Sequence, residues 1–234
     1  MDDQEQRRAE AAEQTHVVRP PRQQLATFGT TSIRYYLVTE PLYRELDTKP
    51  HEEESVVREG VVRAERPQVV TPYYMMRHEG FGDDAAKFIE QVMREHGPDA
   101  PGLLYTYKNE GMETTIVSGA PQEVAGRIVE RLDRDHRALD AVIRGVDDLW
   151  DVSLMKFIFE LTSNSVRSNV SEMRAHGLLD VEGGVPRDAR QRIERLLQEA
   201  RRGAVDPSDV HRELERWGLF EEYQDRFLSL FKRR

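Results

Sequence analysis

The stretch LTSNSVRSNVSEMRAHGLLDVEGGV, Leu161–Val185, carries the pattern that says most about the fold. Val166, Val170 and Met173 are separated by four and three residues, and side chains with this spacing share one face of an α-helix. The pattern therefore predicts a helix whose three apolar residues form a buried stripe.

Polar and glycine residues indicate where this helix begins and ends. Residues Ser163–Ser165 can cap the first free N–H groups, and Gly177 can adopt the left-handed conformation that ends a helix. We expect the helix to start within Ser163–Ser165 and to end at His176 or Gly177. The sequence LLDVEGGV then predicts a strand, a tight turn at Gly183-Gly184 and a returning strand.

Two segments upstream are interpreted as the helices that precede it, DHRALDAVIRG (135–145) and VSLMKFIFELT (152–162). Together, residues from about Arg134 to Val185 resemble the winged helix-turn-helix superfamily. The match is carried by the following residues of this chain: Val166, Val170, Met173, Gly177 and Leu178. The upstream half departs from the superfamily pattern, because Lys156 or Phe157 stands where a small residue is preferred and Glu160 replaces the glycine of the turn.

The resemblance implies that the last helix reads DNA with its solvent-facing side. Opposite the apolar stripe lie Asn164, Ser168 and Ser171, with Arg167 and Arg174 on one flank. These five residues are the candidate nucleic-acid-binding site. Two arginines neutralise few phosphates, so support from further basic residues is expected. The candidates for that support are Arg187, Arg190, Arg192 and Arg195.

Composition excludes several kinds of chemistry. The 234 residues include no cysteine, which excludes disulfides, thiolate nucleophiles and cysteine-ligated zinc. The formal net charge of -9 arises entirely before Asp151: that part has 19 basic and 28 acidic residues, whereas the remainder has 15 of each. We expect a cytoplasmic protein without a membrane segment, because no signal peptide or long apolar run is present.

The N-terminal part predicts a second domain. Residues 1–24 lack apolar periodicity and are interpreted as a flexible tail, with helical character around Arg7–Gln14. SIRYYLVTEP alternates as a strand does, and AAKFIEQVMREHG (85–97) carries a helical stripe. The valine pairs in 49–76 indicate short strands or an ornamented loop.

Two further elements complete the expected fold. GLLYTYK and ETTIVSG predict a hairpin that turns at Asn109-Glu110-Gly111, and roughly helical spacing predicts one helix from Pro121 to Gly145. The expected fold class is α/β (α+β): an acidic domain over 25–132 with a small antiparallel or mixed sheet, followed by a helical winged-helix-like domain over 133–234.

Other candidate sites are weaker. The metal-ligand residue types gather only at His51–Glu54, His78–Asp84 and Asp133–His136, without a zinc or calcium pattern, so we interpret them as solvated charge runs or turns. No phosphate-binding glycine loop or nucleophilic serine motif occurs, and no cofactor or metal is expected. Seven of the eight tyrosines precede residue 110 and indicate core, an interface, a ligand pocket or an RNA-stacking surface.

The C-terminal segment predicts two helices, with Asp206 as a cap and Gly218 as the break between them. The second helix is rich in aromatic residues that either pack on their own domain or join copies of the chain: Phe220, Tyr223, Phe227 and Phe231. The expected function is a homodimeric DNA-binding transcriptional regulator whose N-terminal domain senses or assembles. The alternative is a protein-interaction adaptor without nucleic-acid binding, and an enzyme is a third possibility.

Overall fold

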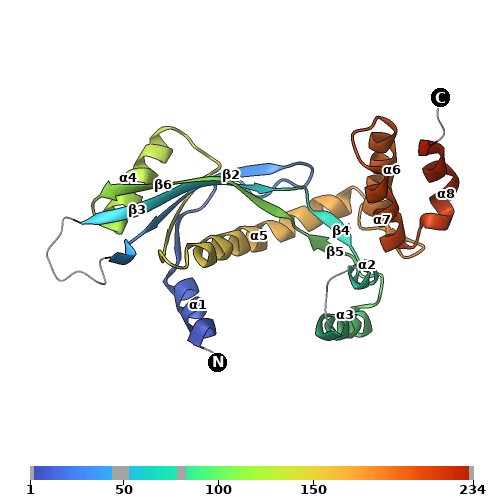
Figure 1. Cartoon of the computed structure of the whole chain (residues 1–234), viewed down its shortest axis with the longest axis horizontal. Helices are drawn as coiled ribbons and strands as arrows, with labels where there is room; N and C mark the ends of the chain where they lie inside the picture. The colour runs from blue at the N-terminus through green and yellow to red at the C-terminus, as the bar shows by residue number, and fades with distance from the viewer. Residues whose placement is uncertain (1–2, 44–52, 78–82, 232–234) are drawn as a thin grey trace. The chain divides into compact units, whose positions relative to one another are not determined.

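The computed structural model describes residues 3–43, 53–77 and 83–231. They form a mixed α/β structure with eight α-helices and a five-stranded mixed sheet (Figure 1), so the α+β class is confirmed. The chain divides into two compact units: unit 1 holds 1–66 and 105–169, and unit 2 holds 67–104 and 170–234. This differs from the expected consecutive domains, because β4 (Gln68–Val70) packs on a C-terminal helix of unit 2.

Unit 1 is built on the five-stranded sheet, in the order β1-β7-β2-β3-β6. Its strands are β1 (His16–Arg19), β2 (Thr31–Thr39), β3 (Glu54–Ala64), β6 (Tyr107–Ser118) and β7 (Asp140–Gly145). β2 and β7 run parallel, and the other neighbours are antiparallel. The strand predicted from SIRYYLVTEP is confirmed as β2.

One helix covers each face of this sheet (Figure 1). On one face, α4 (Pro121–Arg134) packs its apolar side against alternate residues of the strands, such as Tyr36 and Val38. On the other, the first half of α5 (Trp150–Ala175) packs against Ile33 and Leu37. Because both faces are covered, β2 is buried on both sides along most of its length.

The N-terminal segment is not a tail. Residues 1–24 contain α1 (Asp3–Gln14), which agrees with the helical character expected there, but also β1, which adds an edge strand beside β7. Arg19 is buried on β1 and donates hydrogen bonds to Asp133 and to the carbonyls of Arg137 and Asp140. The prediction of a flexible tail was wrong, because the strand pairing of β1 and the hydrogen bonds of Arg19 involve residues that are distant in the sequence.

The predicted hairpin at Asn109-Glu110-Gly111 was also wrong. These residues lie inside the single strand β6, while β5 (Gly102–Leu104) pairs with β4. Glu59 pairs with Glu113 but Val61 pairs with Glu110, so the register shifts there. Gly111 has φ 49, which suits a β-bulge that needs a left-handed residue. The glycine signal therefore marks a bulge and not a turn.

The helix predicted from Pro121 to Gly145 ends early. α4 stops at Arg134, and β7 follows as a strand in which Ala141, Val142 and Ile143 are all buried. A strand buried on both faces is a continuous apolar run, which periodicity alone does not separate from a helix. The segment DHRALDAVIRG is thus mostly strand, and it does not supply the first helix of a helix-turn-helix.

Unit 2 contains mainly helices. They are α2 (Pro72–Met76), α3 (Asp83–His96), α6 (Arg187–Arg201), α7 (Pro207–Trp217), α8 (Phe220–Leu228) and a short 3-10 turn, Ser229–Phe231. The predicted helix over 85–97 and the two C-terminal helices are confirmed. Asp206 caps α7 by accepting a hydrogen bond from Ser208 N at 2.8 Å, and Gly218 has φ 67 at its end.

The aromatic residues of the last helix mostly pack within unit 2. Tyr223 and Phe227 are buried in its core, and Phe220 is partly buried against it. Phe231 alone of the four is largely exposed. Two of the four rings are therefore core, one of the two alternatives that the sequence pattern left open. Self-association through this helix stays a prediction.

A buried ion pair lies at the centre of unit 2. Glu213 accepts hydrogen bonds from Arg192 Nε at 3.0 Å, from Tyr74 Oη at 3.0 Å and from Trp217 Nε1 at 3.0 Å. Burial, together with the charge of Glu213, raises the pKa of Tyr74, so the phenol keeps its proton. Glu213 thereby links α7 with α6 and α2.

Candidate functional site

Helix α5 carries all five residues of the candidate site, and it is a single helix. It runs without interruption from Trp150 to Ala175, so it does not begin within Ser163–Ser165 as predicted. The hydroxyl of Thr162 donates to the carbonyl of Ile158 at 2.6 Å. Such bonds satisfy the polar side chain inside a continuing helix, so no cap or turn forms there. The second helix that the winged-helix resemblance implies is thus not separate from the third.

The buried side of α5 differs from the predicted stripe. Met173 is fully buried, but Val166 is 38% exposed and Val170 is only partly buried. The residues that face the core instead are Ser165 and Asn169, which are 0% and 1% exposed. The buried face of α5 is therefore rotated by about one residue from the face predicted by Val166, Val170 and Met173.

Hydrogen bonds explain why two polar residues take the inner side. Ser165 Oγ accepts from Leu25 N at 3.0 Å. Asn169 Nδ2 donates to the carbonyl of Leu25 at 2.9 Å and to Thr27 Oγ1 at 2.8 Å, while its Oδ1 accepts from Tyr105 Oη at 2.8 Å. These bonds fasten the segment between β1 and β2 to α5, and each of these buried polar groups has a partner.

The candidate binding residues remain accessible on the helix surface. Asn164, Arg167, Ser171 and Arg174 are exposed, and Ser168 is partly buried. The helix ends at Ala175, one residue before the predicted His176, and Gly177 follows with φ 65 while Leu178 N is bonded to Met173 O at 3.0 Å. The structure thus leaves the predicted polar face open to a partner.

The hairpin after α5 is confirmed. β8 (Val181–Glu182) pairs with β9 (Val185–Pro186) across the Gly183-Gly184 turn, where both glycines have positive φ. A strand, a two-residue turn and a returning strand were predicted for these residues. The element that would act as a wing in the resemblance is therefore present.

Two of the four supporting arginines are engaged elsewhere. Arg190 pairs with Glu222 at 2.7 Å, and Arg192 is buried against Glu213. Arg187 and Arg195 are exposed. Of the four candidates for a supporting basic surface, Arg192 is therefore unsuitable, because α6 carries its side chain inward.

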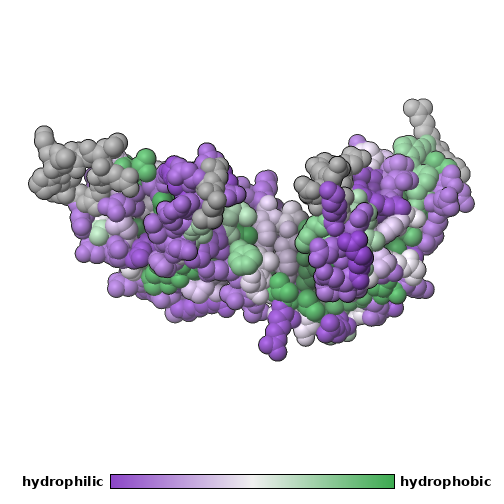
Figure 2. Space-filling model, turned by 90° about the horizontal axis from the view of Figure 1, so that it is seen from below, coloured by the Kyte–Doolittle hydropathy of each residue, from purple (hydrophilic) through white to green (hydrophobic). Residues whose placement is uncertain are grey.

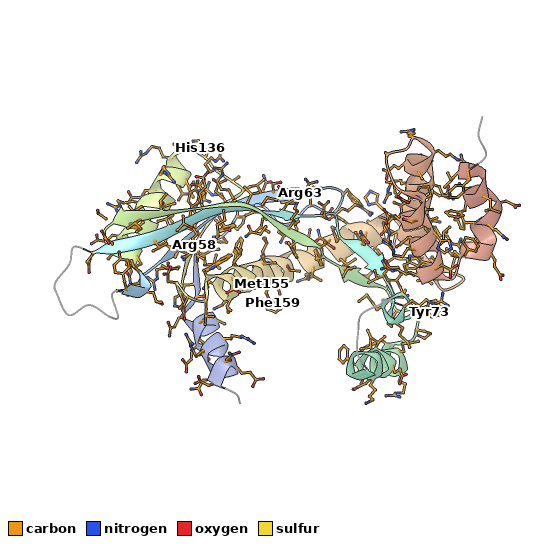
Figure 3. The ribbon with its side chains drawn as sticks, in the orientation of Figure 1. Arg58, Arg63, Tyr73, His136, Met155 and Phe159 are labelled. Atoms are coloured by element: carbon orange, nitrogen blue, oxygen red, sulfur yellow. The ribbon has the colours of Figure 1, made fainter. Side chains whose placement is uncertain are left out.

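An apolar stripe on α5 escaped the sequence analysis. Met155 is 61% exposed and Phe159 is 70% exposed, one turn apart on the same face (Figure 3), and Val166 continues that face two turns further on. Figure 2 shows such apolar patches within a mainly hydrophilic surface. The sequence signal was the i, i+4 spacing of Met155 and Phe159, within a segment that was interpreted only as a helix preceding the binding helix.

A cavity of about 530 Å³ in unit 1 was also missed. It lies where the parallel strands β2 and β7 end, at the paired residues Thr39 and Gly145. Asp147, in its lining, accepts hydrogen bonds from Thr39 at 2.7 Å and from Arg58 at 2.6 Å. Burial opposes ionisation, but these bonds outweigh it and lower the pKa of Asp147. The charges of Asp147 and Arg58 compensate each other, so the cluster fastens the segment after β7 to β2 and β3.

Metal-binding residues do not gather in the described part of the chain. Within it, no group of three or more His, Cys, Asp or Glu side chains could hold a metal ion. Of the three clusters considered, His51 and Glu52 and residues 78–82 lie outside the described residues. In the third, Asp133 is paired with Arg19 and Arg22.

Comparisons with known proteins do not assign the chain to a family. No family model, no curated protein and no solved structure matches this chain. Nor does any helix within 3–43, 53–77 and 83–231 combine the length and apolarity needed to cross a membrane.

Proposed function

We propose that the chain is a protein-interaction adaptor that binds a partner through the exposed apolar stripe of α5. The observation that carries this proposal is the exposure of Met155 and Phe159 on a helix whose opposite side is firmly packed. Large apolar side chains that adjoin on a rigid element are typical of interaction sites, since their exposure to water is unfavourable unless a partner covers them.

The stripe suits a partner with an apolar face. Its flanking residues Lys156 and Glu160 lie 3.8 Å apart, nitrogen to oxygen, so their charges compensate each other and do not select a strongly charged partner. Phe159 is the most exposed large apolar side chain of the helix and would be the central anchor, because aromatic residues supply much of the binding energy in many interfaces.

The double substitution Met155→Asp/Phe159→Asp is expected to abolish partner binding while leaving the fold intact. Loss of an aromatic anchor costs about 2 kcal/mol or more, a decrease in affinity of roughly 30-fold. Proteins retained from native lysate by parent and variant, with and without nuclease, are quantified by mass spectrometry, and the main retained partner is then purified and titrated.

The matched control is Arg167→Glu/Arg174→Glu on the same helix. The adaptor proposal requires that this control retain the partner and that nuclease treatment not release it. Equal retention by the parent and by the Met155→Asp/Phe159→Asp variant would contradict a role of the stripe.

The second candidate is DNA binding by a transcriptional regulator. It is favoured by a specific observation: Asn164, Arg167, Ser171 and Arg174 are exposed on one helix that is followed by a hairpin. Against strong binding stand the acidic charge of the chain and the engagement of Arg190 and Arg192 in ion pairs. We therefore expect DNA binding, if it occurs, to be weak and sensitive to salt.

If DNA is bound, Arg167→Glu/Arg174→Glu is expected to eliminate binding with stability changed by only about 0.5 kcal/mol, because both side chains are exposed. With few phosphates neutralised, the logarithm of affinity should fall with the logarithm of salt with a slope of about 2 to 4. Fluorescence anisotropy with genomic fragments measures both quantities. A parent protein that binds no fragment at low salt rules out this function.

A further inference from the structure

A groove of about 540 Å³ lies in unit 1 on the face of the sheet that α4 covers. α4 packs over β7, β2 and β3, whereas β6 is the edge strand beyond them. The helix therefore leaves open the space between its own flank and the outer strand. The floor and wall of this groove are apolar, formed by Val57, Val117, Val124 and Ile128.

Two arginines one helical turn apart border the groove on the α4 side. Arg127 Nη2 donates to the carbonyl of Ser118 at 2.6 Å, and the guanidinium of Arg131 lies 5.4 Å from the ring centre of Tyr36. Both side chains are exposed, and neither has a carboxylate within ion-pair distance in the part of the chain that the structure describes.

The remaining polar groups of the groove add little negative charge. Glu59 is its one carboxylate, and it is paired with Arg34 at 2.6 Å. Tyr36 stays a neutral phenol at physiological pH, since burial and then the nearby acids raise its pKa. The groove thus combines an apolar floor with two arginines that form no ion pair with the described residues, although the chain as a whole is acidic.

We propose that this groove binds a small amphipathic carboxylate. The apolar body of the ligand lies along Val57, Val117 and Ile128, where covering apolar surface is favourable. The carboxylate lies at the mouth, where Arg127 and Arg131 donate hydrogen bonds to it and Arg131 remains beside Tyr36. The site is independent of the α5 stripe.

Octanoate is the probe for this site, with acetate and octylammonium as matched ligands that lack the apolar body or the negative charge. Calorimetric titration of the full chain is expected to give binding of octanoate at least about tenfold tighter than of either matched ligand. Arg127→Gln/Arg131→Gln should weaken octanoate binding by about tenfold or more, because both charge-assisted bonds are lost.

Arg134→Gln is the control, since Arg134 is exposed on the same helix but does not line the groove. It should change octanoate affinity by less than about twofold. Val117→Asn tests the floor at a partly buried position and should also weaken binding, with thermal unfolding recorded to verify the fold. The proposal is overturned if the parent does not bind octanoate, if octylammonium binds equally well, or if the double variant binds as the parent does.

Discussion

Replacing Glu213 by alanine is expected to lower the free energy of unfolding by about 3–5 kcal/mol, the usual cost of removing one partner from a buried ion pair. The carboxylate accepts from Arg192, Tyr74 and Trp217. Without it, the guanidinium of Arg192, which is 8% exposed, keeps only the more distant carboxylate of Asp188, 3.8 Å away. The phenol and the indole N–H lose their hydrogen bonds as well.

Urea denaturation followed by tryptophan fluorescence measures this loss. Trp217 lies beside Glu213 in unit 2, and a Trp150→Phe background limits the signal to that unit. Glu215→Ala is the control, because Glu215 is exposed on the same helix and should change stability by only about 0.5 kcal/mol. The double change Arg192→Met/Glu213→Leu should recover only the part of the loss that comes from the poorly compensated guanidinium, because Tyr74 and Trp217 still lack their acceptor. An unchanged midpoint for Glu213→Ala would show that the pair is not needed.

The parts of the fold that depend on neighbouring residues were predictable from the sequence. β2 alternates in polarity, α7 has a capping aspartate and a terminal glycine, and the β8–β9 hairpin has a two-glycine turn. Each signal acts within a few residues of the structure it determines. These elements were therefore located correctly without knowledge of their tertiary environment.

The parts that depend on distant pairing were not predictable. β1 is a strand because β7 offers it an edge, and β7 is a strand because helices cover both of its faces. Neither the free edge of β7 nor its covering helices can be recognised from the local sequence pattern. The same holds for the bulge at Gly111, where the partner strand decides that a glycine in an extended segment is not a turn.

The candidate site was predicted in part. The exposure of Asn164, Arg167, Ser171 and Arg174 followed from helical geometry. The buried side was misplaced, because hydrophobicity assigns Val166 to the interior and Ser165 to the surface. The partners that make Ser165 and Asn169 suitable for burial come from Leu25 and Thr27, about 140 residues earlier. This error also concealed the apolar stripe at the helix surface.

Asn169→Leu is expected to destabilise unit 1 by about 3 kcal/mol, although it places an apolar residue at a buried position. Asn169 satisfies the buried carbonyl of Leu25, the hydroxyl of Thr27 and the hydroxyl of Tyr105. Each group left without a partner costs about 1–3 kcal/mol. Burying the leucine side chain returns only about 1.5–3 kcal/mol, and its branched shape does not match the planar amide.

Val166→Asn is the matched comparison. It replaces an apolar side chain by asparagine, the reverse of Asn169→Leu, at a neighbouring position of the same helix. With Val166 38% exposed, this change should alter stability by only about 0.5 kcal/mol. The apolar stripe expected from the sequence predicts the opposite order, a costly Val166→Asn and a neutral Asn169→Leu. Urea denaturation in a Trp217→Phe background, where fluorescence reports Trp150 of unit 1, distinguishes them. If Val166→Asn proves the more damaging change, the buried side of α5 is the one that hydrophobicity indicates. The exposure of Met155 and Phe159 on a free surface is then contradicted.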